Sequence, residues 1–148
     1  MIPTLYLSNW ASKDLHGSGP KWSIMARPRA WEQGMGTVRV LTPAVDDLLA
    51  LKALRLDWPT YRARFLAGLP PAAQLAPLAL QAHARIHTRF ACQDVPVADG
   101  DSLLCACSKA DAAKGHCHRV FCAEVLQAAG WQVVLDGRVL SLGAGRVS

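Results

Sequence analysis

The run Ser102–Cys107, SLLCAC, carries no charge and lies between a turn-rich segment, 96–101, and the polar stretch SKADAAKGH. A short apolar run bounded by polar turns is typical of a central strand that is buried on both faces. A helical pattern follows over Cys117–Ala129 and ends at Gly130. A buried strand that leads into a helix indicates an α/β domain with a mainly parallel sheet.

The rest of the chain fits this class. Apolar patterning predicts further strands over 4–10, 37–41 and 132–136, and helices over Asp46–Arg55, Trp58–Leu66 and Ala72–Phe90. We therefore predict a small single domain over 1–148, with a sheet of about four strands flanked by helices. Residues 11–36 form a long irregular stretch, which predicts a functional or mobile loop, and we expect the tail 141–148 to be frayed.

The composition limits the compartment and the partners. Of the residues, 51% are hydrophobic and 18% charged, which predicts a folded chain. No apolar run reaches the length of a membrane span, so no membrane partner is expected. The N-terminus lacks the pattern of a signal peptide, and five cysteines without one predict thiols in the cytoplasm. The net charge of +5 suits an anionic small molecule or nucleic acid.

The segment between the strand and its helix is the first candidate site, because ligands of such sheets bind at the carboxyl ends of the strands. Here His116, Cys117, His118 and Arg119 surround the predicted helix N-terminus, where backbone N–H groups favour an anion. Arg119 could hold the anion, Cys117 act as nucleophile and a histidine transfer a proton. The alternative is a solvated arginine beside a cysteine that only fills space.

A metal is the second interpretation of the same segment. Cys105, Cys107 and Cys117, with His116 or His118 as fourth ligand, form a set that zinc would suit. Two observations count against a metal. Cys105 and Cys107 share one strand face, yet both would have to point toward the loop where Cys117 lies, and the C-x2-C spacing of most structural zinc sites is absent. Cys122 lies on the apolar stripe of the helix and is expected in the core.

Tryptophans and basic residues alternate in the N-terminal stretch. Such a mixture is typical of surfaces that stack bases and hold phosphates. The alternative is a loop that packs its tryptophans on the sheet and leaves its charges in water. Since this loop follows the first strand, we expect it at the same sheet edge as the cysteines. The candidate ligand-binding residues here are Asn9, Trp10, Lys21, Trp22, Arg27 and Arg29.

The motif LLC at 103–105, followed by CHR at 117–119, resembles the signature of an uncharacterised bacterial family, domain of unknown function number 488. YLSNWAS, GSGPKWSIMARPRAW and LTP follow the order of that family too, so the resemblance covers most of the chain. It implies a compact cytosolic α/β domain and no established reaction. Many members have an acidic residue where this chain has Cys107, which favours a thiol or metal role here.

These observations lead to one function and two alternatives. We predict an α/β protein that binds a nucleotide, nucleic acid or phosphorylated ligand at the carboxyl end of its sheet, and whose Cys117, His118 and Arg119 would carry any catalysis. Whether it is an enzyme stays open, and so does its oligomeric state. The alternatives are a non-catalytic binding module stabilised by zinc and a nucleic-acid-binding adaptor, whose binding would weaken with salt.

Overall fold

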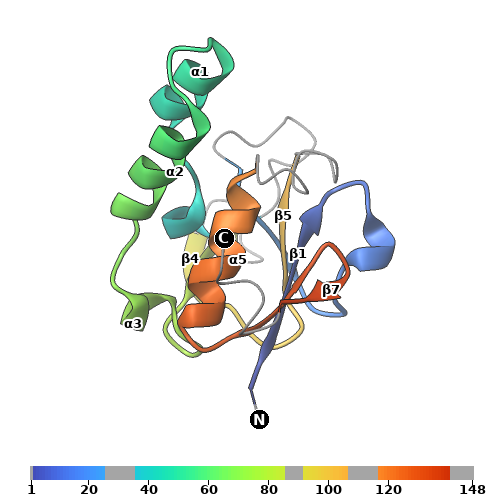
Figure 1. Ribbon diagram of the computed structural model, residues 1–148. Helices are drawn as coiled ribbons and strands as arrows, with labels where there is room; N and C mark the ends of the chain where they lie inside the picture. Colours follow the sequence, from blue (N-terminus) through green and yellow to red (C-terminus); the bar gives the residue numbers. More distant parts are fainter. Residues whose placement is uncertain (1, 26–35, 86–91, 107–116, 141–148) are drawn as a thin grey trace.

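A five-stranded sheet forms the centre of the molecule, in a computed structural model that describes residues 2–25, 36–85, 92–106 and 117–140. The strand order is β2-β5-β1-β6-β7, and the paired central strands β5 and β1 are labelled side by side in Figure 1. The first four strands are mutually parallel and β7 runs antiparallel to β6, which confirms the predicted α/β class. The bounds are β1 Thr4–Asn9, β2 Lys21–Ser23, β5 Ser102–Cys105, β6 Gln132–Leu135 and β7 Arg138–Val139.

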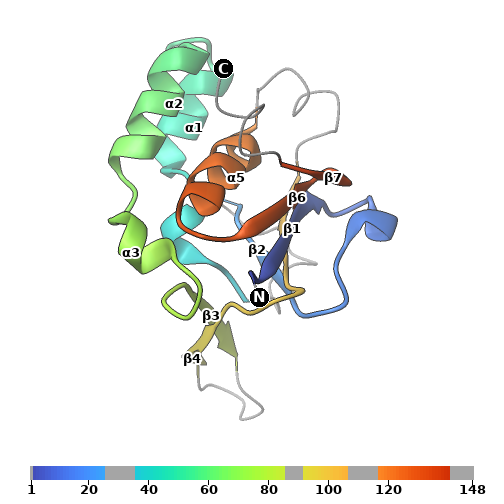
Figure 2. The same cartoon turned by 60° about the horizontal axis from the view of Figure 1, so that its bottom comes forward.

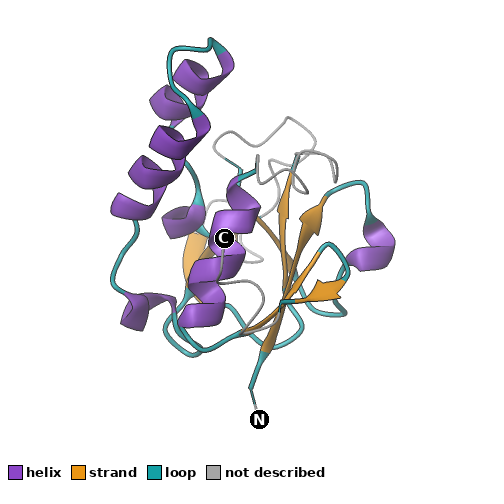
Figure 3. Cartoon of the chain, in the orientation of Figure 1, coloured by secondary structure: helices purple, strands orange, loops and turns teal. Residues whose placement is uncertain are grey.

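Helices flank the sheet. The helices α1 (Val45–Lys52), α2 (Trp58–Ala67) and α5 (His118–Ala128) lie on one side, and the 3-10 helix η1 (Lys13–Leu15) lies on the other (Figure 3). The short helix α3 (Ala72–Leu75) is tied to the end of α5, since Trp131 Nε1 donates to the Leu75 carbonyl at 2.7 Å. Within the described ranges, no helix is long and apolar enough to cross a membrane.

The apolar run that predicted a central strand forms β5, and all four of its residues are buried. It lies between β1 and β2, so both of its edges are paired, and the burial of successive residues shows that both of its faces are covered as well. Its neighbour β1 contributes Leu5 and Leu7, and α5 contributes Phe121, Cys122 and Leu126 to the same core. Helix α2 packs on α5 through Tyr61 and Phe65, whose rings contact Phe121. The predicted central strand and its helix are therefore correct to within two residues at each end.

The long helix predicted over Ala72–Phe90 is wrong. Helix α3 ends at Leu75, because Ala76 precedes a proline and takes an extended conformation that cannot continue a helix. Leu78 then adopts a φ of 74° and is 91% exposed, although the helical pattern placed it in the core. The chain continues as a hairpin of β3 (Gln81–Arg85) and β4 (Cys92–Pro96), in which tertiary pairing overrides the helix propensity of alanine (Figure 2).

The strand predicted over 37–41 is also wrong beyond its first residue. Thr37 bridges Ser23 of β2 to His83 of β3, and the chain then forms the 3-10 helix η3 over Arg39–Leu41. Val38 and Leu41 are buried and Val40 is exposed, a spacing of three that suits a 3-10 turn. His83, which falls within the helix predicted over Ala72–Phe90, lies on β3 and contacts Asp94 at 3.1 Å.

Candidate thiol and guanidinium site

Three strand ends and one helix start meet at the carboxyl edge of the sheet. Asn9 and Cys105 are register partners at the ends of β1 and β5. Asp136 follows β6, where its backbone N–H donates to the Leu7 carbonyl at 2.8 Å. Cys117 is the N-cap residue of α5. Parallel strands place their carboxyl ends at one edge, so the topology brings together residues that lie far apart in sequence (Figure 1).

Arg119 is the centre of this cluster, which consists of Cys105, Cys117, Arg119 and Asp136. Its side chain is 0% exposed. Its Nη1 donates to Cys105 Sγ at 2.9 Å and lies 3.7 Å from Cys117 Sγ. Its Nη2 and Nε donate to Asp136 Oδ2 at 3.1 and 3.3 Å. The buried guanidinium thus has an anionic carboxylate on one side and two sulfur atoms on the other.

The environment keeps Arg119 charged. Burial alone would lower the pKa of Arg119, but attraction to Cys105, the hydrogen bond with Cys105, and attraction to Cys117 and Asp136 outweigh it and raise that pKa. The same attraction acts on the partners, since a fixed cation favours the charged form of a nearby sulfur. Cys117 also occupies the helix N-terminus, where the dipole favours negative charge.

The two sulfur atoms are close and enclosed. Cys105 Sγ and Cys117 Sγ lie 3.3 Å apart, and each residue is 1% exposed. Cys122, on the next turn of α5, is also buried, and burial raises the pKa of its thiol. Its Sγ donates to the Leu41 carbonyl at 3.7 Å, so the prediction that Cys122 belongs to the core is confirmed.

His118 is held by the segment that follows β2. Its Nε2 lies 2.6 Å from the Ile24 carbonyl oxygen, which can only accept, so Nε2 carries the proton. Its ring packs edge-on against Phe65. Burial lowers the pKa of His118, despite opposing effects of Cys105 and of the Ile24 hydrogen bond. His118 therefore fastens the segment after β2 to α5, and Nε2 is not available for proton transfer.

This burial gives a pH dependence. Because the folded pKa of His118 lies below its ordinary value of 6.5, the unfolded chain takes up the proton first. The contribution of the neutral, buried His118 to the free energy of unfolding is complete above about pH 6.5. It is lost as pH falls toward the pKa that His118 has in the folded chain. We expect His118→Gln, whose amide can still donate to Ile24, to reduce the slope of unfolding free energy against pH below 6.5 by up to about 1.4 kcal/mol per unit. Urea unfolding at several pH values measures these slopes, and equal slopes in the variant and the wild type would contradict the prediction.

The N-terminal candidates divide between two edges of the sheet. Asn9 lies at the carboxyl edge, where its Oδ1 accepts from the Ser12 N–H at 2.9 Å. Trp10 follows it, and the Trp10 backbone N–H donates to the Cys105 carbonyl at 3.1 Å. Lys21 and Trp22 pair with Ser102 and Leu103 at the opposite, amino edge.

The reason for this division is geometric. A strand parallel to β1 must begin at the amino edge, so the connecting segment has to run back along the sheet before β2 starts. The Nε1 of Trp22 donates to Asp101 Oδ2 at 2.8 Å, which holds this tryptophan at the start of β5. The structure therefore does not bring Lys21 and Trp22 to the sulfur pair.

Several candidates lie outside the described residues: Arg27, Arg29, Cys107 and His116. Of the predicted metal ligands, the structure brings Cys105 and Cys117 together. Within the part of the chain that the structure describes, no group of three or more His, Cys, Asp or Glu side chains is placed to hold a metal ion.

Asp136 belongs to the cluster around Arg119 but is not among the candidate residues predicted from the sequence. Asp136 and Gly137 both have positive φ, 49° and 85°, and form the two-residue turn between β6 and β7. An Asp-Gly pair after a strand is a strong signal for such a turn. That signal would have placed a carboxylate at the carboxyl edge of the sheet. Its Oδ1 is buried and has no hydrogen-bond partner among the described residues.

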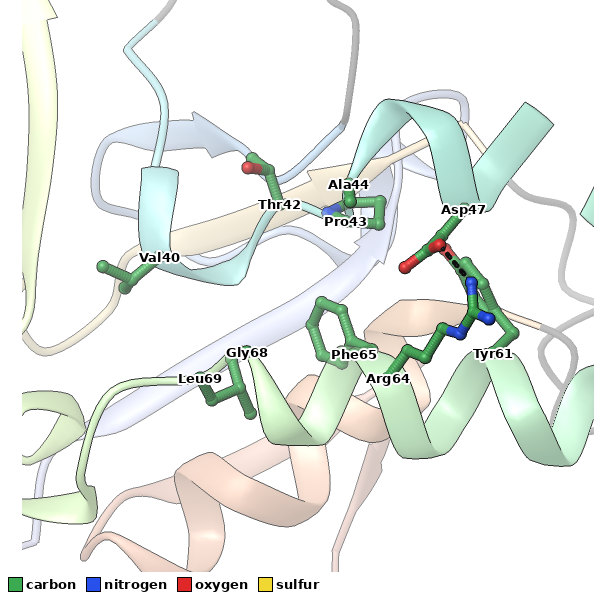
Figure 4. Close-up of a pocket in the computed structure, with 10 residues that line it drawn as sticks. All are labelled: Val40, Thr42, Pro43, Ala44, Asp47, Tyr61, Arg64, Phe65, Gly68 and Leu69. Atoms are coloured by element: carbon green, nitrogen blue, oxygen red, sulfur yellow. Dashed lines mark hydrogen bonds and ion pairs between the residues drawn. The ribbon is translucent and has the colours of Figure 1, made fainter. Parts of the chain in front are cut away.

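A cavity of about 280 Å³ lies elsewhere, between η3, α1 and α2 (Figure 4). Its lining is mostly apolar and includes Val40, Pro43 and Phe65. Its charged groups, Arg64 and Asp47, form an ion pair at 2.9 Å. The paired charges leave it poorly suited to an anionic ligand, in contrast to the cluster around Arg119.

Comparison with known proteins adds no relative. No family model, curated protein or solved structure matches the chain. The resemblance to the bacterial family of unknown function therefore stays a prediction.

Proposed function

We propose that the carboxyl edge of the sheet is a thiol-dependent ligand site for an anionic molecule. The observation that carries the proposal is the donation from the buried Arg119 to Cys105 Sγ, 3.3 Å from Cys117 Sγ. A fixed cation beside two sulfurs favours a thiolate, which is the nucleophilic form of cysteine. The N-terminus of α5 and the net charge of +5 favour a ligand that is a nucleotide, nucleic acid or phosphorylated metabolite.

The role of Arg119 in this proposal differs from the one expected from the sequence. Its guanidinium is fully buried and bound to Asp136 and the sulfur atoms. It acts on the sulfurs and leaves contact with the ligand to the helix N-terminus. Cys105 joins Cys117 as a candidate nucleophile because it is the nearer of the two to Nη1.

Two alkylating reagents test this proposal. Iodoacetate and iodoacetamide share a leaving group and differ in charge, so their rate ratio reports the local potential. We expect Cys105 or Cys117 to show a ratio of iodoacetate to iodoacetamide rates on the order of tenfold above that of glutathione, falling with added salt. Cys122 is the internal control, because it is as buried as Cys105 and Cys117, burial raises the pKa of its thiol, and its Sγ contacts the Leu41 carbonyl.

Trypsin separates Cys117, in the peptide 115–119, from Cys122, in 120–138, whereas fragmentation of the peptide 90–109 distinguishes Cys105 from Cys92 and Cys107. The urea-unfolded chain supplies the accessible reference for each cysteine. If Cys105 and Cys117 react no faster than Cys122 in the folded chain, the thiol role is wrong. If they react with the same ratio of iodoacetate to iodoacetamide rates as glutathione, the proposal of an anionic ligand is wrong.

A zinc-stabilised module is the second candidate, and the proximity of Cys105 to Cys117 favours it. Two thiolates on one tetrahedral zinc would lie about 3.8 Å apart, given bonds of about 2.3 Å. The observed separation is 3.3 Å, and Arg119 already occupies one side of Cys105 Sγ as a cation. Elemental analysis distinguishes the two candidates: one zinc per chain, lost with the fold on chelation, would support the module.

A further inference from the structure

The sulfur pair has the arrangement from which a disulfide can close. A disulfide needs its sulfurs about 2.05 Å apart, so Cys105 Sγ and Cys117 Sγ must approach by roughly 1.2 Å. Both residues have fixed backbones: the Cys105 carbonyl accepts from Trp10, and the Cys117 carbonyl accepts from Val120. Small side-chain rotations on two ordered elements, the end of β5 and the start of α5, supply the movement.

We infer that Cys105 and Cys117 form a reversible dithiol–disulfide pair that exchanges electrons with disulfide-containing molecules. The Cys105 thiolate attacks one sulfur of a disulfide RS–SR, which forms a mixed disulfide and releases one RS⁻. Cys117 then loses its proton to solvent and attacks Cys105 Sγ, which closes the Cys105–Cys117 bond and releases the second RS⁻. The chain loses two electrons and, because Cys105 starts as a thiolate, one proton; solvent supplies the second proton that turns the two RS⁻ into two RSH. This goes beyond the proposed function, because the bond can form whether or not an anionic ligand binds.

Arg119 sets the balance between the two states. In the reduced pair, the guanidinium interacts with a thiolate as well as with Asp136. In the disulfide, the sulfurs carry no charge and only Asp136 compensates the buried cation. A cation that stabilises the reduced form makes the pair a stronger oxidant. Removing the positive charge should therefore shift the equilibrium toward the disulfide, while Arg119→Lys should shift it less.

The experiment equilibrates the wild-type chain with glutathione and glutathione disulfide in graded ratios, without oxygen. Acid quenching, alkylation, tryptic digestion and mass spectrometry then follow. Trypsin cuts after Arg89, Lys109, Lys114 and Arg119, so the expected product links the peptide 90–109 to 115–119. Since 90–109 also contains Cys92 and Cys107, the variants Cys92→Ser and Cys107→Ser should keep the link and Cys105→Ser should lose it.

The variants also test the order of the steps and the role of Arg119. Cys117→Ser should accumulate a glutathione mixed disulfide on Cys105. Arg119→Met should raise the disulfide-to-dithiol ratio on the order of tenfold at a given glutathione ratio, the effect of one charge-assisted hydrogen bond. The inference is overturned if Cys117 is fully alkylated in the most oxidising mixture, or if the link persists in Cys105→Ser. The wild-type titration decides this even if Arg119→Met does not fold.

Discussion

Arg119→Met is expected to lower the free energy of unfolding by about 3–5 kcal/mol, the usual cost of removing one member of a buried charged network. The methionine fills much of the arginine's volume, so the loss reports charge compensation rather than a cavity. Without the guanidinium, the carboxylate of Asp136, 19% exposed, and the sulfur of Cys105 lose their cation. Urea unfolding followed by circular dichroism measures the change.

A matched arginine in an exposed pair provides the control. Arg64 forms an ion pair with Asp47 at 2.9 Å, but its side chain is 56% exposed. Arg64→Met should therefore change stability by no more than about 1 kcal/mol. A double-mutant cycle with Asp136→Asn should show that the double variant loses less than the sum of the two single variants. A small loss in Arg119→Met, comparable to that of Arg64→Met, would mean that the guanidinium is not buried as described.

Leu103→Ala and Leu104→Ala are each expected to destabilise the fold by about 2–5 kcal/mol. Successive residues of a strand point to opposite faces, and both leucines are 0% exposed. Similar losses at both positions would follow from a strand covered on both sides. The same thermal or urea unfolding measurement applies to both variants.

Leu78→Ala serves as the control for these two, because Leu78 is 91% exposed. Its stability should stay within about 0.5 kcal/mol of the wild type. If one of the β5 variants behaved like Leu78→Ala, one face of the strand would be open to solvent. The burial of that leucine in the structure would then be wrong.

Local patterns in the sequence were sufficient for the elements nearest the site. The uncharged run ending in Cys105 and the helix after Cys117 follow from burial and periodicity alone. Because parallel strands end at one edge, their order along the chain also predicted where Cys117 would lie. Local patterns do not predict which residues of other elements each side chain contacts.

The direction of Arg119 shows this limit. An arginine in the first turn of a helix is ordinarily expected in water or on a ligand, and here it is fully buried. Its burial depends on Cys105, Cys117 and Asp136, which belong to three different elements. No periodicity within one element reports such a set. The position of Trp22 escaped prediction for a similar reason, since the segment before β2 returns to the amino edge.

The helix predicted over Ala72–Phe90 failed for a different reason. Alanine favours helices only weakly, and Pro77 stops the helix after one turn. The alternation of buried Ala82 with exposed Gln81 was present, but it was hidden within a run that also fits a helical spacing. Pairing with β4, which lies beyond the residues of that run, decided between the two.

The position of β1 between β5 and β6 has a consequence for how the molecule assembles. Its register partners are Ser102–Cys105 on one side and Gln132–Leu135 on the other, so both of its neighbours are translated long after it. During synthesis, α1 and α2 can associate early, whereas β1 must wait with its edges unpaired. Distant pairings of this kind slow folding and expose strands to aggregation.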